Sequence, residues 1–208
     1  MPWFDTVTDL VEGADVLRRR RYGVIEVVAG RFRRVRLRPF PKIISAPEIL
    51  LFGGLHHSRR PGDRLLLYYN QPLRFPNFLA LKYVVSARHT RMATLTRAAD
   101  ALDEIARLKQ VDAILCDVGN WRISTRLLCR WGWHPHCPSR WHRHYIKRFY
   151  GRYPPPARWI AAAKDGHRRR EATDRQASNA AAKQYDARLN ALLWTPEEYV
   201  FDVDGKET

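Results

Sequence analysis

The pattern of apolar and polar positions in the first part of the chain predicts a helix, a strand hairpin and one more buried strand. Apolar residues recur at helical spacing over Asp5–Leu17. Tyr22–Val28 (YGVIEVV) is rich in β-branched residues, and the turn at Ala29-Gly30 leads to its expected partner strand, Phe32–Leu37. Leu65–Tyr69 (LLLYY) is apolar throughout, which is typical of a strand covered on both faces.

The segment from Phe78 to about Gln110 predicts a strand followed by a helix. Phe78–Val85 (FLALKYVV) is apolar at nearly every position. Thr90 is a suitable N-cap, and the residues behind it place apolar side chains on one stripe of a helix and charged side chains on the opposite stripe. This helix is predicted to reach about Gln110.

A second strand–helix unit and a strand pair follow. Val111–Val118 (VDAILCDV) predicts a strand, and Asn120 is placed to cap the next helix. Gly132 can adopt the positive φ that ends many helices. Trp133–His136 and Trp141–Tyr150 predict two paired strands. The expected fold class is therefore α+β, with a mixed, mostly antiparallel central sheet flanked by helices.

The last part of the chain differs in composition from the rest. Pro154-Pro155-Pro156 stiffens the backbone, and the residues after it are rich in alanine, arginine and glutamine. This tail has helical propensity, with an interruption expected at Asp165-Gly166. We predict an α/β domain over residues 1–151 and a helical or partly disordered tail over residues 152–208.

Charge is concentrated in the predicted domain. The chain has a formal net charge of +16, and the 10 basic and 9 acidic residues from Arg152 onward leave +15 on residues 1–151. Such an excess attracts polyanions, among them nucleic acids, anionic lipid surfaces and phosphorylated cofactors. It is equally typical of a solvated surface, and charge alone does not decide between these interpretations.

The chain has three cysteines, a small and odd number that argues against a disulfide framework and favours a reducing compartment. The chain lacks an apolar run long enough to cross a membrane, and its start does not resemble a secretory signal. We therefore expect a soluble, cytoplasmic protein. The sequence does not indicate an oligomeric state.

An arginine stripe marks the second strand of the predicted hairpin. Arg34, Arg36 and Arg38 share one face of that strand, while Val35 and Leu37 share the other. The stripe could bind phosphate, or it could be the solvated face of an antiparallel sheet.

The order of elements from Phe78 to Tyr150, with Asn120 after a strand and Gly132-Trp133 closing a helix, resembles the GCN5-related N-acetyltransferase family. The resemblance covers these residues and leaves the hairpin and the tail outside it. It implies an acyl-CoA N-acyltransferase fold, acetyl-CoA or another acyl-CoA as cosubstrate, and an amine as acceptor. A V-shaped separation of the two strands over Phe78–Val85 and Val111–Val118 would then leave room for the cofactor.

In that family the cofactor loop has Gln or Arg first, Gly fourth, and Gly or Ala sixth, and its backbone amides bind the CoA diphosphate at a helix N-terminus. The corresponding positions are Arg88–Ala93, where Arg88 and Ala93 match and Arg91 replaces the first glycine. The residues that the resemblance implies for cofactor binding are Val85, Arg88, Arg91, Met92, Ala93 and Asn120.

The resemblance also implies a proton donor for the departing CoA thiolate, often a tyrosine on the second helix. Leu128 occupies that position and cannot donate a proton, whereas its neighbour Cys129 could. The alternative is that Cys129 is a buried, inert thiol. Asp117, His89 and Glu26 are possible general bases. Asp117 and Cys129 are our candidate catalytic residues.

The region before Tyr150 also permits other chemistry. His134, His136, Cys137, His142 and His144 are potential zinc ligands, but their spacing matches no well-known zinc module, and we assign no metal site. The same region interleaves aromatic and cationic residues, a pattern that suits nucleic acid as well as an ordinary sheet.

Three functions thus remain open from the sequence. The first is an acyl-CoA-dependent N-acyltransferase that transfers an acetyl group to an amine. The second is a catalytically inactive module of that fold, which binds nucleic acid or a protein partner through its basic, aromatic-rich surface. The third is a basic interaction protein of unrelated fold. A fold resemblance does not choose among them.

Overall fold

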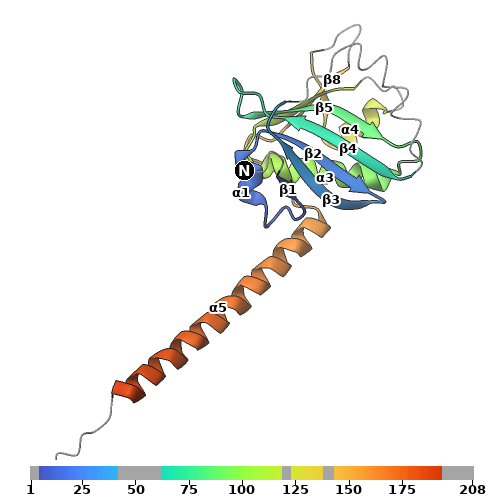
Figure 1. Ribbon diagram of the computed structural model, residues 1–208. Coiled ribbons are helices and arrows are strands. Elements are labelled where there is room, and N and C mark those ends of the chain that lie inside the picture. The colour runs from blue at the N-terminus through green and yellow to red at the C-terminus, as the bar shows by residue number, and fades with distance from the viewer. Residues whose placement is uncertain (1–4, 42–61, 119–122, 138–142, 194–208) are drawn as a thin grey trace, which may run out of the picture. The chain divides into compact units, whose positions relative to one another are not determined.

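A computed structural model describes residues 5–41, 62–118, 123–137 and 143–193, which form an α+β protein (Figure 1). The strands are β1 (Thr6–Val7), β2 (Tyr22–Val28), β3 (Arg31–Arg38), β4 (Arg64–Asn70), β5 (Phe78–Ser86), β6 (Ala113–Asp117), β7 (His134–Pro135) and β8 (His144–Arg148). The helices in these residues are α1 (Ala14–Arg19), α3 (Met92–Leu108), α4 (Thr125–Arg130) and α5 (Arg158–Leu193).

The eight strands form one mixed sheet in the order β1-β3-β2-β4-β5-β6-β8-β7. β5 and β6 pair in parallel, and the other neighbouring pairs are antiparallel. The parallel pair needs a crossover, and α3 supplies it. The predicted class, a mostly antiparallel mixed sheet with flanking helices, is confirmed at this level.

The core lies between the sheet and α3. One side of α3 is buried through Ala98, Leu102 and Ile105, and this helix contacts β2, β3 and β4. Ile25 and Leu67, which are paired in register on β2 and β4, are also buried. Burial of this continuous apolar layer stabilises the sheet and fixes α3 across it.

The predicted hairpin and its arginine stripe are confirmed. β2 and β3 pair around the turn at Ala29-Gly30, where both residues have positive φ. Val35 and Leu37 are buried, whereas the arginines that alternate with them on β3 are partly exposed. The last two strands, β7 and β8, pair as predicted but are shorter than expected.

The helix predicted over Asp5–Leu17 is wrong in its first half. Thr6 and Val7 pair with β3 as a short strand, and α1 begins only at Ala14. The Asp9 carboxylate accepts a hydrogen bond of 2.7 Å from the Val11 amide, which favours a turn over a helix. The spacing of apolar residues over Asp5–Leu17 is thus compatible with a helix and with a strand followed by a turn, and the Asp9 turn favours the second structure.

Element ends also shift by a few residues. α3 ends at Leu108 instead of about Gln110, because Gln110 has a φ of +54° that a helix cannot contain. The next strand begins at Ala113 and ends at Asp117, so it is shorter than Val111–Val118.

The chain divides into two compact units, residues 1–163 and 164–208. Within the first unit, the start of α5 is anchored by Ile160, which is buried in the core, and by Trp159, whose ring stacks on Phe32. The predicted interruption at Asp165-Gly166 is wrong, since α5 runs through it without a break. One glycine costs a helix only about 1 kcal/mol, and its neighbours are good helix formers. No helix among the described residues is long and apolar enough to cross a membrane.

Candidate functional site

Pairing between the parallel strands β5 and β6 stops well before the end of β5. β5 lies between β4 and β6, and it pairs with β4 as far as Ser86. Pairing between β5 and β6 extends only from Phe78 with Ala113 to Leu81 with Cys116. Beyond that point Lys82 is exposed, although it lies in a central strand of the sheet. β6 itself ends one residue after Cys116, at Asp117, so the carboxyl half of β5 extends beyond it; we call this place the β5–β6 divergence. That a cofactor slot lies here stays a prediction from the sequence resemblance.

The loop after β5 positions the start of α3. The N-cap of this helix is Arg91, and the prediction that Thr90 caps it is wrong. The Thr90 hydroxyl instead donates to the Arg64 and Ala87 carbonyl oxygens, at 3.1 and 2.9 Å, and so fastens the loop to β4. Arg91 has a φ of −78°, a conformation open to any residue, so the absence of a glycine there causes no backbone strain.

The start of α3 is positively charged and accessible. Arg88, His89 and Arg91 are exposed, as are Met92 and Ala93. The first turn contains no acidic residue. The first amides of a helix point outward and carry partial positive charge, so this end of α3 suits an anion.

One carboxylate already interacts with this helix start. Asp63, just before β4, accepts a hydrogen bond of 3.0 Å from the Arg91 amide. That amide is therefore not available to a phosphate in this arrangement, and the Asp63 charge opposes a second anion nearby. The sequence pattern alone could not show this contact, because Asp63 is 28 residues away from Arg91.

The turn between β2 and β3 braces the same helix. The Gly30 amide donates to the Thr94 hydroxyl at 2.9 Å, and the Gly30 carbonyl accepts from Arg97 Nε at 3.0 Å. Gly30 has a φ of +72°, which favours glycine over other residues. The first turns of α3 are thus fixed from two sides, by β4 and by the hairpin turn.

On the other side of the divergence, β6 ends at Asp117 and α4 begins at Thr125. The N-cap of α4 is Ser124, whose hydroxyl accepts from the Leu127 amide at 3.2 Å; the predicted cap, Asn120, lies outside the described residues. Gly132 has a φ of +81°, which confirms its predicted role after the helix.

The two candidate catalytic residues are both exposed. The Asp117 carboxylate lies 4.0 Å from His144 Nδ1 on β8. Leu128 is buried in the core, whereas Cys129 is exposed on α4, so the alternative of a buried Cys129 is wrong. The position corresponding to the family's tyrosine thus faces inward and the neighbouring thiol faces outward, because adjacent helix residues differ by about 100° in direction.

Glu26 is held in a buried ion cluster that leaves no role as a general base. Its carboxylate accepts hydrogen bonds of 2.7 Å from Arg34 and 2.6 Å from Arg64. Burial acts to raise the pKa of Glu26, but the hydrogen bonds and charges of the two arginines outweigh burial and lower it. Arg34 of the predicted stripe is therefore partly structural.

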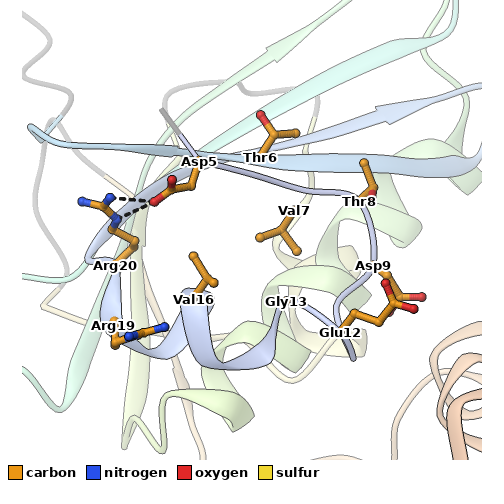
Figure 2. Close-up of a pocket in the computed structure, with 10 residues that line it drawn as sticks. All are labelled: Asp5, Thr6, Val7, Thr8, Asp9, Glu12, Gly13, Val16, Arg19 and Arg20. Carbon is orange, nitrogen blue, oxygen red and sulfur yellow. Dashed lines mark hydrogen bonds and ion pairs between the residues drawn. The ribbon is translucent and has the colours of Figure 1, made fainter. Parts of the chain in front are cut away.

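A separate hollow of about 850 Å³ lies beside β1 and α1 (Figure 2). Asp9 and Glu12 line one side of it, and Arg19 and Arg20 line the other. The Asp5 carboxylate accepts hydrogen bonds from Arg20 at 2.6 and 2.9 Å. Because β1 is at the far edge of the sheet from β6, this hollow is not part of the β5–β6 divergence.

In the part of the chain that the structure describes, no group of three metal-binding side chains lies together, so the histidines and the cysteine named as potential zinc ligands form no such cluster there. His142 falls outside these residues. His136 and Cys137 are adjacent, with Nε2 and Sγ at 3.4 Å.

The structure thus places Val85 near the end of β5, Arg88 and Arg91 on the connection that follows, and Met92 and Ala93 at the start of α3. Asp117 lies at the end of the neighbouring strand. Sequence reasoning missed Lys82 and Asp63. Lys82 had a signal, since it is the single charged residue in FLALKYVV.

Two comparisons with known proteins were made. A scan against protein-family models found no match. A search of curated proteins also found no match.

Proposed function

We propose that this protein is an acyl-CoA-dependent N-acyltransferase of the kind that the sequence resembles, with its cofactor between the diverging ends of β5 and β6. The observation that carries the proposal is that a central strand, β5, extends beyond its parallel neighbour β6 directly before a basic helix N-terminus. In α/β sheets, ligands commonly bind beyond the carboxyl ends of parallel strands.

The diphosphate of CoA would lie at the start of α3. Amides of Met92 and Ala93 would donate to it, and the exposed side chains of Arg88 and Arg91 would supply positive charge. Arg91 in place of glycine then adds a cationic ligand without straining the backbone. Asp63 weakens this site but does not fill it, since its carboxylate contacts the Arg91 amide.

The amide-containing pantetheine arm of CoA would extend along β5. From Lys82 onward, no pairing with β6 is found among the described residues, so the Lys82 and Val84 backbone is positioned to pair with an extended ligand as a strand would. The exposure of Lys82 and the partial exposure of Val84 are consistent with a ligand at this edge.

The reaction would join the acceptor nitrogen to the acyl carbon. An uncharged amine attacks the thioester carbonyl, the C–N bond forms, and the C–S bond breaks as the tetrahedral intermediate collapses. Asp117 would accept the proton that the nitrogen loses, and the Cys129 thiol would protonate the CoA thiolate. Both side chains are exposed, Asp117 where β6 ends and Cys129 on α4.

Calorimetry with acetyl-CoA tests the proposal. We expect micromolar binding, reduced about tenfold or more in the Arg88→Ala/Arg91→Ala variant, since two charge-assisted contacts to phosphate are lost. Arg126→Ala removes an exposed arginine from α4 and should leave the affinity unchanged. Binding weaker than millimolar by the unaltered protein would rule out the enzyme.

A second candidate is a catalytically inactive module of the same kind, which binds nucleic acid. The specific observation in its favour is that Asp63 occupies the Arg91 amide, together with the inward position of Leu128. This candidate predicts no acetyl-CoA binding and RNA binding that falls steeply with added salt.

A further inference from the structure

Large apolar side chains are exposed mainly at one end of the sheet. Seven such side chains are exposed among the described residues, and four of them lie at the same end. These four are Phe40 (64% exposed), Leu73 (70%), Phe75 (60%) and Tyr150 (66%). Scattered exposed apolar residues need no explanation, but a group of them points to an interaction surface.

The strand register places the four at one end of the sheet, spread along it from β3 to β8. Tyr22 at the start of β2 pairs with Arg38 at the end of β3 and with Asn70 at the end of β4. Ala113 at the start of β6 pairs with Phe78 on β5 and Arg148 on β8. Phe40 and Tyr150 follow β3 and β8 by two residues, and Leu73 and Phe75 lie between β4 and β5. This end is opposite the β5–β6 divergence.

The connection that bears Leu73 and Phe75 is braced. Gln71 Nε2 donates to the Pro76 carbonyl at 2.5 Å, and the Phe78 amide donates to the Phe75 carbonyl at 3.1 Å. Asn77 Nδ2 donates to the Asp112 carboxylate at 2.8 Å, and the Asp112 amide donates back to the Asn77 carbonyl at 2.7 Å. Both large side chains are therefore held outward by a fixed backbone and cannot easily turn inward.

Arginines surround these apolar side chains. Arg74 lies between Leu73 and Phe75, while Arg148 and Arg152 flank Tyr150, and all three arginines are exposed. No carboxylate among the described residues forms an ion pair with these three. Asp112, an acid at this end, accepts a hydrogen bond from Asn77. The surface thus combines exposed apolar groups with exposed arginines that form no ion pair with a described carboxylate.

We propose that this basic apolar end, made of Phe40, Leu73, Phe75 and Tyr150 with Arg74, Arg148 and Arg152, docks on an anionic lipid bilayer. Leu73 and Phe75 enter the interfacial region, and the arginines contact lipid phosphates. Apolar side chains with basic residues beside them are suited to the boundary between lipid headgroups and acyl chains. The net charge of +16 adds long-range attraction to an anionic surface.

Nucleic acid fits this surface less well than lipid. Base stacking uses aromatic rings, and three of the four apolar residues are aromatic, but the most exposed of them, Leu73, is aliphatic. An aliphatic side chain there gains from transfer into hydrocarbon and gains little from contact with a base.

Co-sedimentation with vesicles tests the proposal on the full chain. Binding is expected to vesicles of phosphatidylcholine with phosphatidylglycerol, and little or none to phosphatidylcholine alone. Leu73→Ser/Phe75→Ser should weaken binding by about tenfold or more, since two apolar side chains no longer enter the bilayer. Tyr185→Ser is the matched control, because Tyr185 is 65% exposed but lies on α5 in the second unit, and it should bind normally.

Arg74→Glu provides an independent variant that keeps the apolar side chains. It should weaken binding at low salt and have a smaller effect at high salt, because charges are screened there. Thermal melting confirms that each variant is folded. The proposal is overturned by failure to bind anionic vesicles, by unchanged binding of Leu73→Ser/Phe75→Ser, or by a loss that follows Tyr185→Ser. RNA binding that Leu73→Ser/Phe75→Ser weakens, together with no vesicle binding by the unaltered protein, would assign the surface to nucleic acid.

Discussion

Arginines have different roles at the two ends of the sheet. Toward the end where β5 and β6 diverge, Arg34 and Arg64 both contact the buried carboxylate of Glu26. At the opposite end, Arg74, Arg148 and Arg152 are exposed and form no ion pair with a described carboxylate. Some arginines of this basic protein are thus used in ion pairs within the fold, and others are exposed and can contact a ligand. Their burial and their contacts distinguish the two kinds.

The positive charge at the start of α3, near the β5–β6 divergence, is partly balanced by an acid. Arg88 and Arg91 are exposed, but Asp63 contributes a negative charge beside them. Charge at this end is therefore partly balanced, and an anion would have to bind against Asp63. The opposite end also has an acid, Asp112, which accepts a hydrogen bond from Asn77. Its exposed arginines form no ion pair with a described carboxylate, and apolar side chains are exposed beside them.

The largest loss of stability is expected when Glu26, the shared partner of Arg34 and Arg64, is replaced. Glu26→Gln leaves Arg34 and Arg64 without their shared carboxylate and should lower the free energy of unfolding by about 2 kcal/mol, less than for a fully buried pair because both arginines keep contact with water. Urea denaturation measures it. Asp15→Asn, which removes an exposed partner of Arg18, should cost no more than about 0.5 kcal/mol. Equal losses in the two variants would contradict the distinction.

The same cluster predicts a pH dependence. The pKa of Glu26 is lowered in the folded protein, so the folded state binds fewer protons than the unfolded state near the ordinary value of 4.5. The stabilisation is present above that value and is lost as the pH falls through the folded pKa. The difference in unfolding free energy between the unaltered protein and Glu26→Gln should therefore shrink in acid. A difference that grows below pH 4.5 would show that the sign is wrong.

A smaller effect is expected at Asp63. Asp63→Asn keeps an acceptor for the Arg91 amide but removes the charge, and it should tighten acetyl-CoA binding about threefold to tenfold, or about 1 kcal/mol. Calorimetry measures the change. Asp9→Asn is the matched control, because Asp9 also accepts a backbone amide but lies on the β1–α1 connection. Weaker binding in Asp63→Asn would mean that Asp63 supports the site.

Much of the sheet could be predicted from local pattern. β2, β3, β4 and β5 match their predicted strands within two residues at each end, because apolar and β-branched runs leave little choice. The start of the chain could not be predicted, since apolar spacing over Asp5–Leu17 fits a helix as well as a strand and turn. The turn depends on the Asp9 side chain and on pairing of β1 with β3.

The candidate site was only partly accessible to sequence reasoning. The loop from Arg88 to Ala93 could be placed between a strand and a helix because both neighbours have clear patterns. Contacts between distant residues could not be placed, such as Asp63 with Arg91 or Arg64 with Glu26. The exposure of Cys129 likewise depends on which side of α4 meets the core, and Leu128 takes that side.

Amide hydrogen exchange, measured with acetyl-CoA and then with anionic vesicles, tests most directly that the two ends of the sheet recognise different ligands. We predict that acetyl-CoA slows exchange over residues 82–93 and leaves residues 71–77 unchanged, and that vesicles slow exchange over residues 71–77 and leave residues 82–93 unchanged. Acetyl-CoA that protects neither segment, or two ligands that protect the same segment, would contradict the account.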